Sequence, residues 1–265
     1  MLGILVLSFS HAHVRDVEPV DQNLEPEFTD IDANSFRLKN GLLVKIVRNR
    51  SMGEVKLQLD INNPPHSDFD LAGIDEVTNA ILGTVSKDLT SAEINQELNT
   101  LRATMDINLS SSTMTLPLSK LQEGLALFAE VTTDGIFPQV RVDEEKEALI
   151  TNIEKIRRDA EEIADNVAIR LAYGYEHPYG ERPRIPTVRA INVNNIFLHY
   201  QANYTVDNAV LTIEGNITRD EVKPYLEYTF APWTPSKPLF DTTVETENVQ
   251  YAQLNIVDVR GLDKS

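Results

Sequence analysis

An alternation of apolar and polar residues at positions 55–62 constrains the fold of this chain more than any other feature of its sequence. The apolar residues are Val55, Leu57, Leu59 and Ile61, and the polar residues between and after them are Lys56, Gln58, Asp60 and Asn62. Successive side chains of a β-strand point to opposite faces, so this segment predicts a strand with one buried face and one face in water.

Further strands are predicted on both sides of this segment. Asn40 and Gly41 stand between two apolar segments, and an Asn-Gly pair in that setting is a strong signal for a β-hairpin over residues 36–47. Apolar residues at 105, 107 and 109 alternate with polar ones, and residues 113–118 are typical of the returning strand, with a turn at 110–112. One more strand is predicted at 209–213.

Helices are predicted between these strands. Residues 73–84 (GIDEVTNAILGT) place Ile74, Val77 and Ile81 on one helical face. Capping boxes at Thr90, Ser119 and Thr218 predict three further helix starts. Residues 140–174 are helical in pattern almost throughout, a loop rich in Pro and Gly follows at 177–186, and another helix is expected at 193–201.

Runs of strands and helices that do not alternate regularly indicate an α+β fold. We expect a mainly antiparallel sheet that is covered on one face by helices. A last apolar segment at 251–259 predicts a strand that nothing later in the chain can pair with, which favours a chain that stops just inside a second domain.

The charge of the chain excludes several classes of function. With 41 Asp and Glu against 24 Lys and Arg, the formal net charge is −17. A surface this acidic repels phosphate backbones and anionic lipids, so we expect no nucleic-acid partner, whereas basic peptides would be attracted. The absence of cysteine removes disulfides, thiolate metal sites and cysteine nucleophiles.

The N-terminus leaves the location of the protein open. Residues 2–9 form a short apolar run followed by small residues, as in a cleaved signal peptide, but no Lys or Arg precedes it. The alternatives are a periplasmic or secreted protein, or a buried strand or internal start in a cytoplasmic one. No apolar run approaches the ~20 residues that span a bilayer, so we expect no transmembrane segment.

The order of elements, and short words within it, resemble one lobe of the insulinase/pitrilysin family of zinc metallopeptidases. The matching words are residues 36–44 (FRLKNGLLV), 73–74 (GI), 89–94 (LTSAEI), 177–180 (HPYG), 200–204, 208–221 and 230–233 (FAPW). The resemblance covers residues 31–235. It divides the chain into a leader or inter-lobe linker at 1–30, the lobe at 31–235, and a linker with the first strand of a following, truncated lobe at 236–265.

The resemblance also shows what is missing. Catalytic lobes of the family carry His-x-x-Glu-His on the first helix, where two imidazoles grip zinc and the glutamate activates a metal-bound water. Aligning Gly73 and Ile74 on the family pattern places the histidines at Glu76 and Ala80 and the base at Asn79. None of the three motif residues is present, so we expect no catalytic residue and no cofactor in this chain, with zinc in a partner lobe.

Other candidate site residues are weak. Glu144 and Glu145 lie near the place of the family's last zinc ligand, but several glutamates on one helix are typical of a solvated face. Together with Glu76 they are candidates for a hard cation such as calcium or magnesium. We expect His66 to be solvent-exposed, His177 to form a structural turn, His199 to occupy an ordinary helix position, and His11 and His13 to belong to the leader.

Three functional hypotheses follow. The first is a non-catalytic lobe or subunit that encloses and positions a peptide or unfolded protein for a zinc-bearing partner lobe. The second is an inactive structural or assembly subunit resembling the core proteins of respiratory complexes. The third, a free-standing enzyme that uses other residues, has no supporting constellation, and the chain alone is expected to be inactive. The sequence names no substrate.

Overall fold

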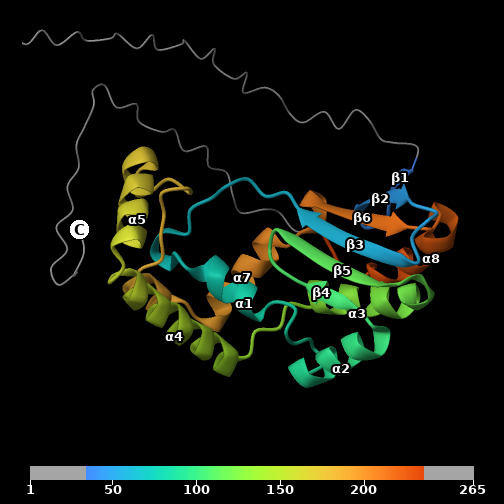
Figure 1. Cartoon of the computed structure of the whole chain (residues 1–265), viewed down its shortest axis with the longest axis horizontal. Coiled ribbons are helices and arrows are strands. Elements are labelled where there is room, and N and C mark those ends of the chain that lie inside the picture. Colours follow the sequence, from blue (N-terminus) through green and yellow to red (C-terminus); the bar gives the residue numbers. More distant parts are fainter. Residues whose placement is uncertain (1–33, 236–265) are drawn as a thin grey trace, which may run out of the picture. The chain divides into compact units, whose positions relative to one another are not determined.

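Six strands form one sheet in a computed structural model of the chain (Figure 1). The structure describes residues 34–235, so the expectations for the leader at 1–30, for His11 and His13, and for the strand at 251–259 lie outside the described residues. The strand order is β1-β2-β6-β3-β5-β4. The strands are β1 (Ser35–Arg37), β2 (Leu43–Arg48), β3 (Glu54–Ile61), β4 (Thr104–Asp106), β5 (Ser111–Pro117) and β6 (Ala209–Gly215).

The sheet is mainly antiparallel, as the sequence predicted. β1 and β2 form the hairpin around Asn40 and Gly41, and β3 pairs antiparallel with both β5 and β6. The pair of β2 and β6 is parallel, with Val44 opposite Leu211 and Ile46 opposite Ile213. β6 lies between β2 and β3 in the sheet, although it is far from both of them in the sequence.

Eight α-helices and three short 3-10 helices are formed by residues 34–235. The α-helices are α1 (Ile74–Ile81), α2 (Ser91–Leu101), α3 (Leu121–Thr133), α4 (Gln139–Ile156), α5 (Ala160–Tyr173), α6 (Ile185–Ala190), α7 (Val193–Asn203) and α8 (Arg219–Thr229). The 3-10 helices are η1 (Phe69–Leu71), η2 (Leu118–Lys120) and η3 (Val206–Asn208). Among these residues, no helix has the length and apolarity needed to cross a membrane.

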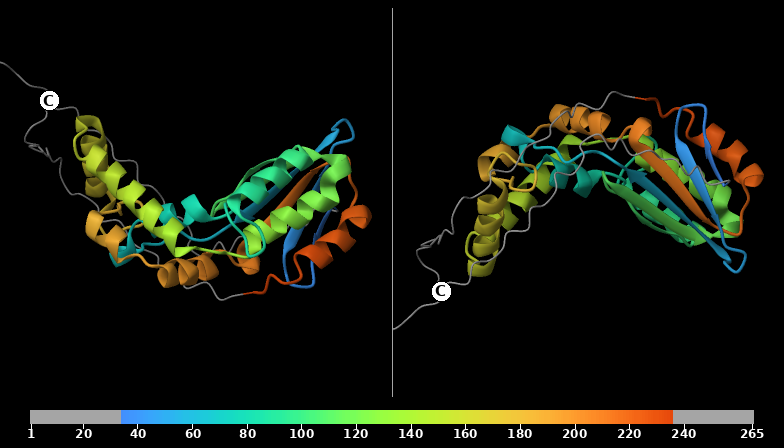
Figure 2. Two further views of the ribbon diagram at one scale, coloured as in Figure 1. Left: turned by 90° about the horizontal axis from the view of Figure 1, so that it is seen from below. Right: turned by 90° about the horizontal axis from the view of Figure 1, so that it is seen from above.

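The alternation of β3 separates the two faces of the sheet. One face carries the apolar residues and is covered by α3 and α8, with α2 beside α3 (Figure 2). The fully buried residues on this face include Val44, Val55, Leu57, Leu59, Leu211 and Ile213. Helices therefore lie on one face of the sheet, and the α+β architecture expected from the sequence is confirmed.

The opposite face is polar. Lys45, Thr212, Gln58 and Thr113 form a row across β2, β6, β3 and β5 by their pairing. Each is partly exposed. Within the described residues this face has no helical cover (Figure 2).

Several local predictions are corrected. Thr90 and Thr218 do close capping boxes with Glu93 and Glu221, but Ser119 does not, because it lies inside η2 and α3 begins at Leu121 without a side-chain cap. The apolar alternation at 105–109 is a strand only as far as Asp106.

The turn after β4 is centred on Asn108 rather than on the serines at 110–112. Its Oδ1 accepts the backbone N–H groups of Ser110 and Ser111, and β5 already begins at Ser111. An asparagine side chain that accepts N–H groups two and three residues onward stabilises a turn of this kind.

The long helical pattern at 140–174 is divided into α4 and α5. The break lies at 157–159, and the Asp159 carboxylate accepts the N–H groups of Glu161 and Glu162 at the start of α5. Asp is a strong N-cap residue because it supplies an acceptor to these otherwise unsatisfied donors. The short helix α6 begins at Ile185, inside the loop expected at 177–186, and continues to Ala190, where no element was expected.

The first hairpin is tied to the C-terminal end of the described chain through Asn40. Its Nδ2 donates to the backbone oxygens of Phe230 and Trp233 at 2.8 and 3.0 Å, and its Oδ1 accepts the N–H of Leu42. The residue that the sequence marked only as a turn therefore also joins two segments 190 residues apart.

We predict that Asn40→Asp lowers the free energy of unfolding by about 1–3 kcal/mol, because the variant loses two donors to buried carbonyls and brings a charge to them. Denaturant titration followed by circular dichroism measures this. The matched control is Asn95→Asp on the exposed face of α2, which makes the same change of charge and is expected to stay within about 0.5 kcal/mol. Equal effects at both positions would contradict the tertiary role of Asn40.

Candidate functional site

The helix that would carry a zinc motif is present and in place. α1 begins after Gly73, whose φ of 108° lies in the left-handed region that favours glycine. A Cβ at Gly73 would also lie only 3.0 Å from Val188 of α6. α1 packs against α4 and α7, and Ile74, Val77 and Ile81 form its buried side, as predicted.

The three motif positions of α1 offer no zinc peptidase site. Glu76 and Ala80 are exposed, and Ala80 has no donor atom. Asn79 is the residue that the sequence resemblance aligned with the base, and its Oδ1 accepts the N–H of Leu109 at 2.7 Å. That amide thus holds the loop between β4 and β5. The residues present do not fit a zinc ion bound as in the family's catalytic lobes, and no catalytic step is derived from them.

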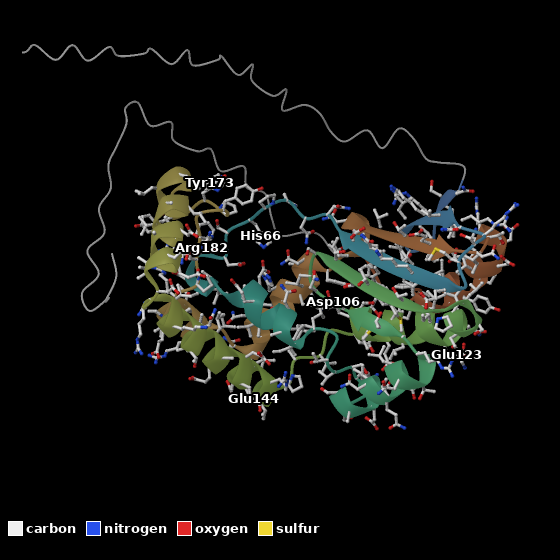
Figure 3. All side chains as sticks on the ribbon, in the orientation of Figure 1. His66, Asp106, Glu123, Glu144, Tyr173 and Arg182 are labelled. Atoms are coloured by element: carbon white, nitrogen blue, oxygen red, sulfur yellow. The ribbon has the colours of Figure 1, made fainter. Side chains whose placement is uncertain are left out.

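Glu144 and Glu145 are held on α4 by Arg141. Its guanidinium binds Glu144 at 2.7 Å and Glu145 at 2.8 Å, as i,i+3 and i,i+4 pairs on one helix. Figure 3 shows Glu144 at the outer edge of α4, well away from His66. Both carboxylates have an ordinary helix-surface environment, which is the solvated face that the sequence analysis favoured.

The structure instead brings together four residues that the sequence analysis did not combine. His66, Asp68, Asp75 and His199 place their ligand atoms within 4.8 Å of one another. We call these four residues the His/Asp cluster. Among the described residues it is the group of His, Asp and Glu side chains able to hold a metal ion, and Glu76, Glu144 and Glu145 do not belong to it.

The members of the cluster come from three parts of the fold. His66 and Asp68 lie in the loop between β3 and α1, Asp75 lies in the first turn of α1, and His199 lies on α7. His66 is visible on this loop in Figure 3. The expectation that His66 is solvent-exposed is wrong, since its side chain is only 11% exposed. His199 is also buried, with 7% of its side chain exposed.

One hydrogen bond and two longer ion-pair contacts connect the members of the cluster. His199 Nε2 lies 2.6 Å from Asp75 Oδ1, and His199 Nδ1 lies 3.6 Å from Asp68 Oδ1. His66 Nε2 lies 3.9 Å from the same oxygen of Asp68. The Asn203 amide donates to the backbone oxygen of His199 at 3.0 Å and lies 3.2 Å from both ring nitrogens.

The two carboxyl groups of the cluster are shifted in opposite directions. Burial raises the pKa of Asp68 to about 7, opposed by the nearby His199 and reinforced by Asp75, Glu181 and Glu76. Burial also disfavours the charged form of Asp75, but its hydrogen bond to His199 and the charge of that ring outweigh this, and the pKa of Asp75 is lowered. The cluster therefore concentrates negative charge around a partly buried carboxyl.

The loop that carries Asp68 is fixed by the segment after α5. The Glu181 carboxylate accepts the N–H groups of Asp68 and Phe69 at 2.8 and 2.7 Å, and Ser67 Oγ donates to the backbone oxygen of Glu176. His177 forms the structural turn that was expected, since its Nδ1 accepts the N–H of Tyr179 and its backbone oxygen those of Gly180 and Glu181.

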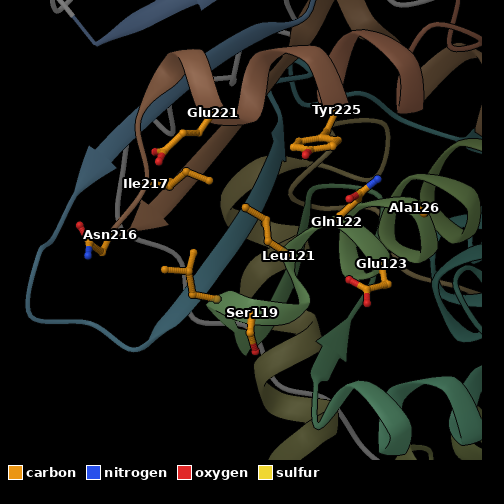
Figure 4. A pocket seen from close by; sticks show the side chains of 10 residues that line it. Ser119, Leu121, Gln122, Glu123, Ala126, Asn216, Ile217, Glu221 and Tyr225 are labelled. Carbon is orange, nitrogen blue, oxygen red and sulfur yellow. The ribbon is translucent and has the colours of Figure 1, made fainter.

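Two pockets bear on the search for a site. One of about 270 Å³ lies beside the cluster and is lined by His66, Asp75, Asn63, Tyr179 and Asn203 among others. A larger one of about 910 Å³ lies between α3 and α8 (Figure 4). Both acidic residues that line it already have partners. Glu221 accepts hydrogen bonds from Thr218 at the start of α8, and Glu123 forms an ion pair with Lys120. The smaller pocket, which His66 and Asp75 line, is therefore the better candidate for a binding site.

The sequence analysis missed the cluster because its members are far apart in the chain. His199 and Asp75 are 124 residues apart. The one local signal was Asp75 on α1 directly beside the motif positions, and nothing nearby in the sequence indicated its partners.

Solved structures match this fold. They include the inactive domain of a peptidase M16 from Pseudomonas fluorescens, with 19% identity and a TM-score of 0.69 over 79% of this chain. A protease from Helicobacter pylori matches with 18% identity and a TM-score of 0.66 over 80% of this chain. The periplasmic protease PqqL from Escherichia coli matches with 16% identity and a TM-score of 0.65 over 82%.

The chain has the fold of one M16 peptidase lobe, which confirms the fold implied by the sequence resemblance. It spans about half the length of the first two matched proteins, 52% of each, and 26% of PqqL. No protein-family model matches the chain, and no curated protein matches it.

We predict that Asn79→Leu lowers the free energy of unfolding by about 1–2 kcal/mol, because the N–H of Leu109 loses its acceptor in a half-buried position. Asn79→Asp keeps an acceptor oxygen at the same place and should recover most of this loss. Thermal and denaturant unfolding of the two variants measure the difference. Equal stability of both variants would show that the hydrogen bond to Leu109 contributes nothing.

Proposed function

We propose that this chain is a non-catalytic lobe or subunit of an insulinase/pitrilysin-type M16 peptidase, which encloses and positions a peptide substrate for a zinc-bearing partner lobe. The observation that carries the proposal is the state of α1. The helix keeps its place in the lobe and its apolar side, while Glu76, Asn79 and Ala80 stand where two histidines and a glutamate would hold and use zinc.

The use of Asn79 as a structural acceptor supports this role. In a catalytic lobe the glutamate at this position activates the metal-bound water. Here the side chain at the same position is bound to the backbone of Leu109. Asn79 therefore has a structural role in this lobe, and α1 acts as part of the scaffold.

The polar face of the sheet supports a role in contacting peptide. Lys45, Gln58, Thr113 and Thr212 present donors and acceptors side by side on a surface without helical cover among the described residues. An extended peptide needs such partners for its backbone groups when it leaves water. The net charge of −17 favours basic peptides.

The matched structures support a partner lobe. It spans about half of the matched proteins, and one of them is described as an inactive domain. A lobe without zinc ligands needs a zinc-bearing lobe to take part in proteolysis. An inactive structural or assembly subunit is the alternative that the experiment distinguishes.

We expect the purified chain to hydrolyse no peptide, with or without added Zn²⁺, because α1 carries no water-activating constellation. The measurement is release of fluorescence from a set of quenched basic peptides. The chain is then co-expressed with a zinc-bearing M16 lobe, or with the protein encoded by the reading frame next to its own. We expect peptide hydrolysis only when both proteins are present, and this combination is called the mixture below. A partner with its motif glutamate changed to glutamine is the control for contaminating protease.

Turnover by the chain alone at the rate of the mixture would overturn the assignment as non-catalytic. A stable complex that leaves the partner's kcat/KM unchanged would favour the structural or assembly role. Failure to form any complex with zinc-bearing lobes would remove the partner part of the proposal.

A substitution on the polar sheet face tests substrate positioning. Thr212→Trp fills the middle of this face on a central strand, and we expect it to raise the KM of the mixture about tenfold, equivalent to about 1.4 kcal/mol of binding free energy. Thr100→Trp on the exposed surface of α2 is the matched control and should leave KM unchanged. If both variants behave alike, the polar face does not contact substrate.

A further inference from the structure

The His/Asp cluster has the arrangement of a metal-binding site that is separate from the motif positions of α1. We propose that His66 Nε2, Asp68 Oδ1 and His199 Nδ1 bind one divalent transition-metal ion, and that Asp75 orients the ring of His199. This proposal does not depend on the role of the chain in proteolysis. It departs from the expectation that the chain carries no cofactor.

The distances from Asp68 Oδ1 to the two imidazole nitrogens suit one ion. Zinc bonds to imidazole nitrogen and carboxylate oxygen are about 2.0–2.1 Å long, so two ligands in a tetrahedral site are about 3.3 Å apart. Asp68 Oδ1 lies 3.6 Å from His199 Nδ1 and 3.9 Å from His66 Nε2. Small side-chain rotations would bring all three atoms to bonding distance.

The contact between His199 and Asp75 has a different character. At 2.6 Å, Nε2 and Oδ1 are too close to be two ligands of one ion, and they have the separation of a charge-assisted hydrogen bond. If Nε2 carries the proton that Asp75 accepts, the lone pair of the ring is on Nδ1, which faces Asp68. A carboxylate that fixes a metal-binding histidine in this way is a regular feature of metal sites.

His66 is oriented in the same way by a backbone group. Its Nδ1 lies 3.3 Å from the backbone oxygen of Pro64, an acceptor that favours the proton on Nδ1. Nε2 then presents its lone pair to the cluster, toward Asp68. Each imidazole thus has one nitrogen directed at an acceptor outside the ligand set and the other directed at Asp68, which is the tautomer pattern that a metal needs.

The surroundings hold the ligands in place before a metal arrives. Glu181 fixes the backbone of Asp68 through two N–H groups, and Asn203 fixes the α7 backbone at His199. Such supporting contacts limit the motion of ligands and so reduce the entropy lost on binding. The pocket of about 270 Å³ that His66 and Asp75 line gives an ion a path from solvent.

The charges of the site favour a cation, and the donor atoms favour a transition metal. Asp75, Glu76 and Glu181 all act on Asp68 with the same sign, so a bound dication would relieve their repulsion. Two imidazole nitrogens with one carboxylate suit zinc and its neighbours in the first transition row, whereas calcium and magnesium prefer oxygen ligands alone.

The experiment measures Zn²⁺ binding by the full 265-residue chain. The protein is stripped with a chelator and dialysed, and bound zinc is counted by elemental analysis across a Zn²⁺ titration. Co²⁺ is used in parallel because its visible absorption reports coordination by nitrogen and oxygen. We expect one equivalent, together with a rise in melting temperature on addition of Zn²⁺.

The variants separate the cluster from other sources of binding. His66→Ala and Asp68→Asn should each weaken Zn²⁺ binding by at least about 100-fold, and Asp75→Asn, which changes a positioning residue, by about 10–100-fold. Asp70→Asn removes the same charge from an exposed residue two positions from Asp68 and should have no effect. The double variant His11→Ala/His13→Ala tests the two histidines near the N-terminus and should keep the full equivalent.

Three results would overturn the proposal. The first is loss of binding in the His11→Ala/His13→Ala variant, which assigns the zinc to that segment. The second is absence of stoichiometric Zn²⁺ or Co²⁺ binding, and the third is equal binding by the parent and Asp68→Asn. Asp68→Asn changes the side chain little in shape, and its folding is checked by circular dichroism, so the test does not depend on the larger change at His66.

Discussion

The burial of one face of the sheet is the constraint on which the rest of this structure depends. β3 and β6 occupy central places in the sheet, and their inward residues, including Leu57, Leu59 and Leu211, are fully buried under helices. Each buried side chain of this size contributes about 1.5–3 kcal/mol by leaving water. A shift of register by one residue would turn this apolar face outward, so the alternation also fixes how the strands pair.

This packing explains how the lobe can keep α1 without keeping zinc chemistry. α1 is held by Ile74, Val77 and Ile81 on its buried side, and the motif positions lie on the other side. Substitutions at the motif positions therefore leave the fold intact. Asn79 accepts the N–H of Leu109 and Asp75 contacts His199, so side chains on the outward surface of α1 also hold neighbouring segments.

Local signals predicted the fold where their cause is local. The Asn-Gly hairpin and the capping boxes at Thr90 and Thr218 depend on residues a few positions apart, and all three are present. The same pattern at Ser119 failed because the preceding chain leaves β5 through a 3-10 turn, which a capping motif does not register. The break between α4 and α5 was missed because the apolar pattern continues through it, while the cap at Asp159 decides where the second helix begins.

The sequence by itself determined most of the strands and helices and the one-sided burial of the sheet, because each depends on residue type at a local spacing. The family resemblance, not the spacing, placed Glu76, Asn79 and Ala80 at the motif positions. Only the tertiary structure decided which distant residues meet. The parallel pairing of β2 with β6, the contact of Asn40 with the end of α8, and the convergence of His66, Asp68, Asp75 and His199 all join segments far apart in the chain. No periodicity encodes such contacts, because they are settled only when the apolar faces of all these elements are buried together.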